Sequence, residues 1–244
     1  MYAFFQSCLQ FFQDWSQQLY ETFVEDSRYM WLVDGLKNTL TITLGALAIG
    51  VILGGLIAVI KYFSEDRKGL RFFAKLCDIY VTTVRGIPVV VLLIIFYYLV
   101  FASYDNGVVV AIITFGLNSA AYMAELIRSG INAVDPGQME AGLSLGMTKL
   151  QAMRKVVFPQ AIKNILPAIG NEMIALLKET AVAGYVAVED LTRAGNLIRN
   201  NTYDAFNPLV AVALVYLLLV IGLTKLLNKL ERRLGKSDRR RKSA

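Results

Sequence analysis

Histidine is absent from the 244 residues of this sequence, and cysteine occurs only twice. Without histidine, the chain can form neither a histidine-based metal site nor a Ser-His or Cys-His catalytic pair. Cys8 and Cys77 lie in different segments with no CxxC spacing, and no phosphate loop of the form GxxxxGK[ST] occurs. We therefore expect neither a catalytic centre nor a metal site. Any energy that the chain uses must come from a partner or from a gradient.

Charged residues are also scarce, at 18% of the sequence, whereas soluble domains average about 25%. Hydrophobic residues make up 56%, and the mean hydropathy is +0.50. Charge-free runs long enough to cross a bilayer recur, since a spanning helix needs about 20 mostly apolar residues. We expect an all-α integral membrane protein. Residues 1–27 contain no lysine or arginine, so we expect no signal peptide.

Five apolar segments are predicted to cross the membrane. They comprise residues 38–60, 76–101, 107–127, 157–185 and 205–224. The fourth segment is the most polar, because two prolines and four charged residues interrupt it.

Basic residues orient these segments through the positive-inside rule. The connections 61–75, 128–155 and 225–244 carry eighteen lysine and arginine residues, whereas the connections on the other side carry four. This asymmetry predicts an outside N-terminus and a cytoplasmic C-terminus, consistent with five crossings. The basic tail, 231–244, is expected to anchor the chain to anionic lipid rather than to nucleic acid.

Residues 1–27 form a predicted amphipathic helix. Its apolar face carries Phe4, Phe5, Cys8, Leu9, Phe12, Trp15, Leu19 and Phe23. Glutamine and acidic residues on the other face favour a helix that lies on the outer membrane surface. The alternative is a sixth crossing, which would reverse the N-terminus.

A polar segment, EAGLSLGMTKLQAMRKVVFP (residues 140–159), separates two apolar runs on the predicted cytoplasmic side. Its first residues can form a short helix that ends at Gly146, which suits a C-terminal cap. Thr148 and Gln151 have the spacing of a capping box, which predicts a second short helix. Pro159 is expected to mark the turn back into the membrane. The segment therefore predicts a two-helix knob outside the bilayer.

This segment resembles the EAA loop of permease subunits of ATP-binding-cassette (ABC) importers, whose pattern is E-A-A, three residues, G, nine residues, I-x-L-P. The matching residues are Glu140, Ala141, Gly142, Gly146, Val156, Phe158 and Pro159. Three of them depart mildly from the pattern, since Gly142, Val156 and Phe158 replace alanine, isoleucine and leucine. Gly142 is expected to loosen the first helix by about 1 kcal/mol relative to alanine.

Further stretches resemble the polar amino-acid permeases of the histidine, glutamine and arginine type. They are GLKNTLTIT (35–43), TTVRGIPVVVLLIIFYY (82–98), LNSAAYMAELIRSGI (117–131), PQAIKNILPAIGNEMIALLKETAV (159–182) and VEDLTRAGNLI (188–198). The resemblance implies the core of a type I ABC importer permease. We divide the chain into an amphipathic segment (1–30), a five-helix permease domain (31–230) with a coupling loop (134–159), and a basic cytoplasmic tail (231–244).

The resemblance also implies the function and the partners. The chain would be the non-catalytic permease subunit of an ATP-driven importer in the cell (inner) membrane. Its loop would seat in a cytoplasmic ABC ATPase dimer, which binds ATP and magnesium, and Glu140 would pair with a basic group there. A second permease copy, favoured as a homodimer, and an extracytoplasmic substrate-binding protein would complete the assembly. Segment 188–198 would be an outer gate helix near that binding protein.

Polar residues inside the predicted spans mark a candidate substrate pathway. They are Thr82, Arg85, Asn118, Tyr122, Glu125 and Glu179. Arg85 and Asn118 lie about 14 to 16 Å inside their predicted helices at 1.5 Å per residue. A charge at that depth costs at least about 2.5 kcal/mol. Asn118, Tyr122 and Glu125 share one helical face.

These residues can form a site for a zwitterion. Arg85 would hold an α-carboxylate through two hydrogen bonds. Glu125 or Glu179 would meet an amino group or a cationic side chain, and Thr82 and Asn118 would supply hydrogen bonds. The alternative is that the charges pair within the protein, for example Arg85 with Glu125.

Three acids (Glu125, Glu172 and Glu179) against Arg85 and Lys178 favour a substrate with a positive side chain, such as arginine, lysine or histidine. Glutamine and cystine stay open, and an acidic substrate is least favoured.

Two other classes of protein compete with the importer. A gradient-driven secondary amino-acid transporter would also place charges in the membrane, but it usually shows internal repeats. An intramembrane enzyme would have only acid pairs with which to act.

Overall fold

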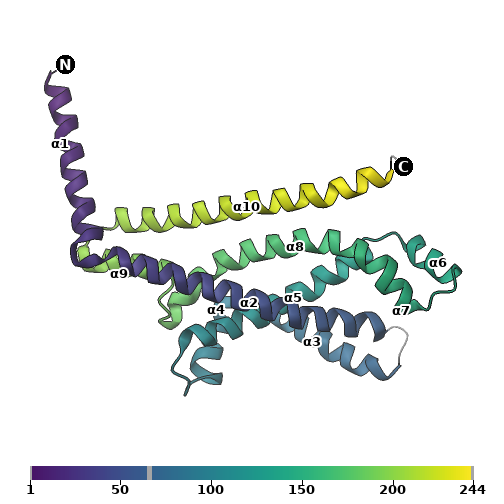
Figure 1. Ribbon diagram of the computed structural model, residues 1–244. Coiled ribbons are helices and arrows are strands. Elements are labelled where there is room, and N and C mark those ends of the chain that lie inside the picture. The colour runs from purple at the N-terminus through teal and green to yellow at the C-terminus, as the bar shows by residue number, and fades with distance from the viewer. Residues whose placement is uncertain (1, 65–67, 243–244) are drawn as a thin grey trace.

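The computed structural model describes residues 2–64 and 68–242, and every regular element within these ranges is a helix (Figure 1). The longer helices are α1 (Tyr2–Leu19), α2 (Tyr29–Ser64), α3 (Arg71–Gly86), α5 (Gly107–Asn132), α8 (Phe158–Glu179), α9 (Leu191–Thr202) and α10 (Phe206–Lys242). The shorter ones are α4 (Val89–Ile95), α6 (Pro136–Ser144) and α7 (Lys149–Ala152). The 3-10 segments η2 (Glu25–Ser27), η3 (Lys68–Leu70) and η6 (Thr180–Val186) and the π-helical segments η1 (Tyr20–Val24), η4 (Phe96–Val100) and η5 (Met153–Val157) join or extend them. The prediction of an all-α protein is confirmed.

Three helices of the described chain are long and apolar enough to cross a membrane. They are α2, α5 and residues Phe206–Leu234 of α10. The pair formed by residues Lys68–Gly86 and Val89–Val100 qualifies only if it is taken together across a bend of 105°. Helix α8 is not among them, because prolines, glutamine, asparagines and charged residues together lower its hydropathy. The predicted count of five crossings is therefore matched by length and composition in three helices, or four with the bent pair.

The second predicted span, residues 76–101, is interrupted and does not form one continuous helix. Helix α3 ends at Gly86, and Ile87 adopts an extended conformation with φ −105° and ψ 130°. The ring of Pro88 disfavours helical geometry at the residue before it, which explains the break at Ile87. Pro88 then caps the start of α4. As a result, α3 ends beside α5 and does not continue into α4 as one long helix.

Helices α2 and α5 form the centre of the fold. A Cβ atom added at Gly50 of α2 would lie 2.7 Å from the Ser119 hydroxyl, and one added at Gly54 would lie 2.5 Å from the Met123 Cβ. These glycines therefore allow α5 to approach closely, as small residues do between membrane helices. Ile42 on α2 and Phe115 on α5 are fully buried in the adjoining apolar core.

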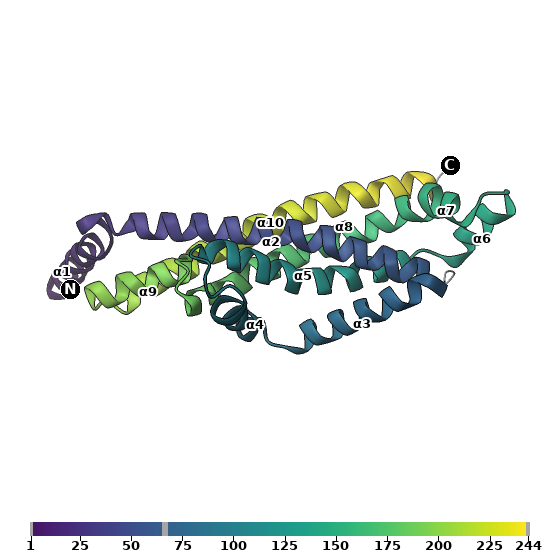
Figure 2. The same cartoon turned by 90° about the horizontal axis from the view of Figure 1, so that it is seen from below.

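The connections gather at two ends of the helical bundle. Helices α6 and α7 lie at the end where α2 finishes and α3 begins, whereas α9 and the segment after α4 lie at the other end (Figures 1 and 2). Helix α10 starts at the end that holds α9 and runs toward the end that holds α6 and α7 (Figure 1). This arrangement agrees with the alternation of sides that the basic residues predict.

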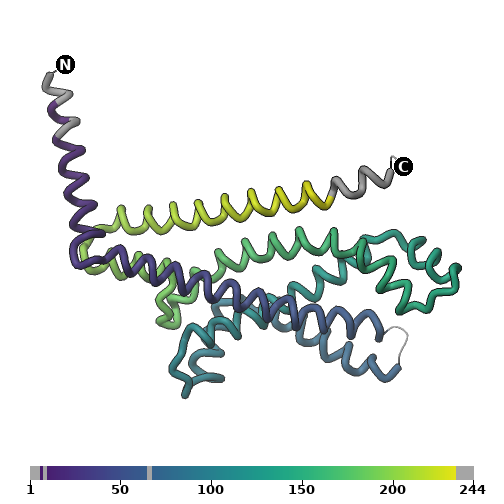
Figure 3. The backbone as a smooth tube through the Cα atoms, in the orientation of Figure 1, coloured from purple at the N-terminus to yellow at the C-terminus, as the bar shows by residue number. Residues whose placement is uncertain are grey.

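Helix α1 turns away from the bundle (Figure 3). Phe11 and Phe12 are 65% and 60% exposed, so their rings contact little of the rest of the chain. The predicted side chains at positions 4, 5, 8 and 9 of the apolar face lie outside the described ones, as do the side chains of residues 235–242 and the whole of residues 243–244 in the predicted tail. The end of α1 is tied to α10, because the Trp15 indole N–H donates to the Asn207 side-chain oxygen at 3.2 Å.

The buried carboxylate of Asp204 fixes this junction. It accepts hydrogen bonds from the Thr22 hydroxyl at 2.8 Å and from the Asn207 side-chain amide at 2.7 Å. The backbone N–H groups of Phe206 and Asn207 also donate to it, so that it caps the start of α10. Burial by itself would raise the pKa of Asp204, but these donors outweigh burial and hold the pKa below its usual value.

Thr22→Val should loosen α1 from α10, because it removes a hydroxyl donor from an ionised acceptor while keeping the side-chain shape. The expected loss is about 1.5 to 3 kcal/mol of local stability, measured as faster amide hydrogen exchange in η1 and the end of α1. Thr22→Ser keeps the donor and should exchange like the wild type. Because folding lowers the pKa of Asp204, this stabilisation is present above about pH 4 and is lost as pH falls through the folded-state pKa. Equal exchange in Thr22→Val and wild type would contradict the assignment.

Candidate functional site

An open cavity of about 510 Å³ lies between α3, α5 and the end of α2. Its lining residues are Lys61, Asp78, Val81, Thr82, Arg85, Gly86, Tyr122 and Glu125. Helix α3 carries most of them at a spacing of three or four residues, which places them on one side of that helix. Four of the six predicted pathway residues, namely Thr82, Arg85, Tyr122 and Glu125, therefore meet at one cavity.

Arg85 lies in the last turn of α3, next to the break at Ile87. Its predicted depth assumed a helix that starts at Leu76, but α3 starts at Arg71 and ends one residue after Arg85. A cation is favourable in the last turn of a helix, where the unpaired carbonyl groups carry partial negative charge. The guanidinium carbon lies 5.1 Å from the centre of the Tyr122 ring, a cation–π contact.

Glu125 is paired with two cations, neither of which is Arg85. Its Oε1 atom lies 3.0 Å from the Lys61 Nζ atom, and its Oε2 atom lies 2.7 Å from an Arg128 nitrogen. Lys61 also reaches the Asp78 carboxylate at 2.8 Å. Among the side chains that the structure describes, Arg85 forms no ion pair. The alternative pairing of Arg85 with Glu125 is therefore not formed.

Two predicted pathway residues lie away from this cavity. Asn118 shares a helix with Tyr122 and Glu125, but it is 4% exposed and does not line the cavity. Glu179 is exposed at the end of α8 and does not line it either. Sequence reasoning missed Lys61, which it counted only among the basic residues of the connection 61–75. Its signal was weak, because its partners lie 17 and 64 positions further along the chain.

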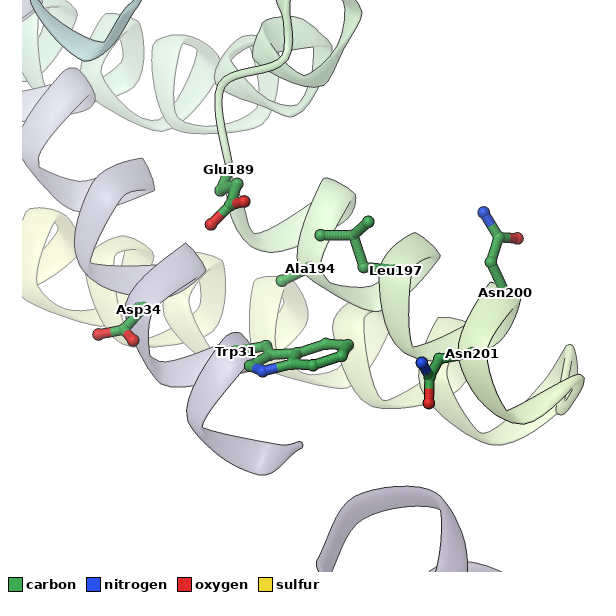
Figure 4. Close-up of a pocket in the computed structure, with 7 residues that line it drawn as sticks. All are labelled: Trp31, Asp34, Glu189, Ala194, Leu197, Asn200 and Asn201. Carbon is green, nitrogen blue, oxygen red and sulfur yellow. The ribbon is translucent and has the colours of Figure 1, made fainter. Parts of the chain in front are cut away.

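A second cavity, of about 430 Å³, lies between the start of α2 and α9 (Figure 4). The Trp31 ring extends along one side of α9. Asp34 and Glu189 stand at one end of the ring, and Asn200 and Asn201 stand beyond the other. Sequence reasoning gave no role to Trp31 or Asp34, because their distance from α9 along the chain hides their proximity in the fold.

Helix α9 is fixed to α2 through its first residues. Asp190 is fully buried and accepts hydrogen bonds from the backbone N–H groups of Thr192 and Arg193, so it caps α9. Burial raises the pKa of Asp190 although these donors oppose the change. The Leu191 N–H donates to the Thr39 hydroxyl of α2 at 3.0 Å. The helix that the spacing of segment 188–198 predicts is therefore present and docked.

The predicted two-helix knob is formed by α6 and α7. Gly146 has φ +78° and ends α6, with its N–H bonded to the Leu143 carbonyl and the Met147 N–H bonded to the Gly142 carbonyl. This pair of bonds is the Schellman arrangement, in which a left-handed residue terminates a helix. The predicted capping box of Thr148 and Gln151 at the start of α7 is also present. Both predicted caps are confirmed.

Gly142 allows α6 and α7 to pack closely. It is buried, and an added Cβ would lie 2.9 Å from the Cβ of Ala152. The prediction that this glycine loosens α6 did not consider that contact. The absence of a side chain at Gly142 lets α6 and α7 approach each other. The Lys149 ammonium lies 5.5 Å from the Tyr62 ring centre, which connects the knob to α2.

The chain forms no loop at Pro159, where the turn back into the membrane is predicted. Helix α7 continues through the π-helical turn η5 into α8, so that residues 149–179 form one unbroken helical path. In η5 the Phe158 N–H bonds to the Met153 carbonyl, five residues back. Pro159 is the second residue of α8 and has no N–H to donate; it directly follows the π turn, where the α-helical hydrogen-bond pattern is already shifted. The knob is therefore continuous with a helix of the bundle.

A profile of the family described as binding-protein-dependent transport system inner membrane component matches residues 50–236. The chain belongs to this family. Its members are non-catalytic, multi-pass membrane permeases that work with a separate ATPase and a substrate-binding protein. This membership favours the importer over the gradient-driven alternative.

Similar curated proteins cover most of the permease. The putative glutamine transport system permease protein GlnP of Rickettsia bellii is 36% identical over 85% of this chain and 94% of its own length. The arginine transport system permease protein ArtQ of Bacillus subtilis is 37% identical with the same coverage. A crystal structure of an amino acid ABC transporter with histidines matches with a TM-score of 0.78 and 41% identity, over 86% of this chain and 98% of that chain. The MetNI methionine ABC transporter, at 24% identity and a TM-score of 0.71, shares the type I permease fold.

Gly146→Ala should destabilise the end of α6 in this permease. The cost comes from the left-handed backbone, about 1 to 2 kcal/mol for a residue with a Cβ, because the space around Gly146 is open. We expect about tenfold faster hydrogen exchange of the Met147 amide, which donates across the turn. Gly146→Asn should lose less, since asparagine tolerates this conformation. Equal protection in all three proteins would show that the turn does not depend on glycine.

Proposed function

We propose that this permease is the membrane subunit of an ATP-driven importer of polar amino acids, and that the cavity between α3 and α5 belongs to its substrate pathway. The observation that carries this proposal is the Arg85 guanidinium, which faces the cavity without a carboxylate partner among the described side chains. An unpaired guanidinium can bind an α-carboxylate through two parallel hydrogen bonds. The names of the glutamine and arginine permease relatives support the same class of substrate.

The knob formed by α6 and α7 is proposed to couple this permease to the ATPase, which would bind ATP and magnesium. Glu140 is exposed on α6, and Ala141 is exposed beside it. Leu145 and Leu150 are also largely exposed at 79% and 60%, and thus offer apolar area to a partner. The continuous path from α7 into α8 would carry movement of the ATPase pair to the helices of the bundle.

A second permease copy, in a homodimer, would complete the pathway. The cavity beside Arg85 is open in one chain, and the apolar part of α10 is almost wholly exposed. We propose five crossings with the N-terminus outside, α1 on the outer surface, and the basic tail in the cytoplasm. Helix α9 and the cavity beside Trp31 would then face the binding protein. Two such permeases could expose the Arg85 region alternately to each side.

Glu140→Lys should prevent the ATPase from co-purifying with the permease, because it reverses the exposed charge proposed to pair with a basic group. Gln138→Lys introduces the same residue about 200° around α6, at 100° per residue, with a charge change of one unit instead of two, and serves as the control. The elution profile of the membrane subunit should stay that of the wild type in both variants. Undiminished ATPase binding and uptake in Glu140→Lys would remove α6 from the coupling surface.

Arg85→Ala should abolish substrate-stimulated ATPase activity in the complete transporter, because the carboxylate loses its bidentate donor. Arg85→Lys keeps the charge without the fork of donors and should retain only part of the stimulation. Tyr122→Phe keeps the ring under the cation and should stay close to wild type. Stimulation that saturates normally in Arg85→Ala would refute the role of Arg85.

A further inference from the structure

We infer that Lys61 is a specificity-determining residue that excludes substrates with a cationic side chain. Its ammonium group occupies the position between two carboxylates where such a side chain would bind. The substrate class is then amino acids with an uncharged or acidic side chain. This inference rests on the proposed function of the cavity beside Arg85.

The position of Lys61 is fixed by two carboxylates from different helices. The ammonium lies 2.8 Å from the Asp78 Oδ1 atom of α3 and 3.0 Å from the Glu125 Oε1 atom of α5. The Lys61 side chain is only 18% exposed, although it lines the open cavity. A substrate cation would need these same two oxygen atoms, because charged donors bind carboxylates at such distances.

The other oxygen of Glu125 is occupied as well, since Arg128 binds Oε2 at 2.7 Å. Both oxygens of Glu125 therefore already accept from a cation of the protein. Asp78 is 57% exposed, which leaves it able to accept one further ammonium group. The α-ammonium that every amino acid carries would use Asp78, and no second carboxylate of the cavity is left for a cationic side chain.

The charges around the cavity point in the same direction. Lys61, Arg85 and Arg128 supply three positive charges, whereas Asp78 and Glu125 supply two negative ones. The region therefore carries one net positive charge before any substrate binds. A neutral zwitterion leaves this balance unchanged, whereas a cationic amino acid adds a second like charge in a site that is partly desolvated.

The sequence favoured a cationic substrate because of three acids, but the fold does not bring all three to the cavity. Glu179 lies away from the cavity. Glu172 of α8 accepts a hydrogen bond at 3.3 Å from the Ser119 hydroxyl of α5, and it does not line the cavity either. Glu125 is the only one of the three that lines the cavity, and its charge is matched within the protein. Lys61 and Arg128 reverse the balance that those acids suggested.

The test compares L-glutamine with L-arginine as probes on the purified permease–ATPase complex without the binding protein, so that the binding protein does not impose its own selectivity. Equilibrium binding of each radiolabelled probe is measured for wild type and for Lys61→Met, which removes the ammonium but keeps an unbranched side chain. Lys61→Arg keeps the charge, and Lys68→Met removes an exposed lysine just beyond the end of α2 as the matched control.

We expect wild type to bind glutamine at least tenfold more tightly than arginine. Lys61→Met should raise arginine affinity at least tenfold and change glutamine affinity less than threefold, because Asp78 and Glu125 then accept the guanidinium. Lys61→Arg and Lys68→Met should keep the wild-type ratio. A mere loss of folding would weaken both probes together and would not change their ratio.

The inference is overturned if wild type binds arginine as tightly as glutamine, or if Lys61→Met keeps the wild-type ratio. It is also overturned if neither probe binds to either complex. ATP-driven uptake is measured on the same preparations after the binding protein has been added back to complete the transporter. Absence of uptake in wild type would remove the proposed function itself, whereas uptake with an unchanged ratio would remove only the role of Lys61.

Discussion

Glycines on α2 bring this helix so close to α5 that no Cβ atom could be added at Gly50 or Gly54 without displacing a neighbour. Apolar burial drives helices together only weakly inside a bilayer, so that close packing of this kind contributes much of the attraction. The other elements are arranged on this pair. The start of α2 holds α9 through Thr39, and its end holds α3 through Lys61. Helix α3 is held against this pair by the Lys61–Asp78 ion pair, by the Tyr80 hydroxyl, which donates to the Leu117 carbonyl, and by apolar packing around Val81, and the cavity beside Arg85 lies between these helices.

The parts of the fold that depend on neighbouring residues were predictable from the sequence. Thr148 with Gln151, and the glycine at 146, specify helix ends through contacts within a few positions, and the structure contains both caps. The three most apolar helices could also be predicted, since their hydropathy needs no knowledge of contacts. The break at Ile87 was missed although Pro88 signals it locally, because the apolar run continues on both sides of the break.

The candidate site was predictable only in part, because its charges come from three helices. Helical spacing placed Tyr122 and Glu125 on one face, and both line the cavity. The same spacing included Asn118, which is buried in the packing of α5. Nothing in the sequence pairs Lys61 with Asp78 and Glu125, since the three meet only when α2, α3 and α5 pack. A count of intramembrane charges therefore differs from the charge balance of the cavity, because only Glu125 and Arg85 of the five counted residues line it.

The π-helical turn η5 sets the phase between the knob and α8. A π turn contains one residue more than an α turn, and one residue corresponds to about 100° of rotation around a helix axis. The faces of α7 and α8 are therefore offset by this angle while their axes stay joined. The extra residue is accommodated by a shifted hydrogen bond and not by a loop. Rotation of α7 can therefore pass into α8 without a flexible connection between them. Migration of this turn by a few residues along the path would rotate the intervening segment by about 100° relative to the rest of α8.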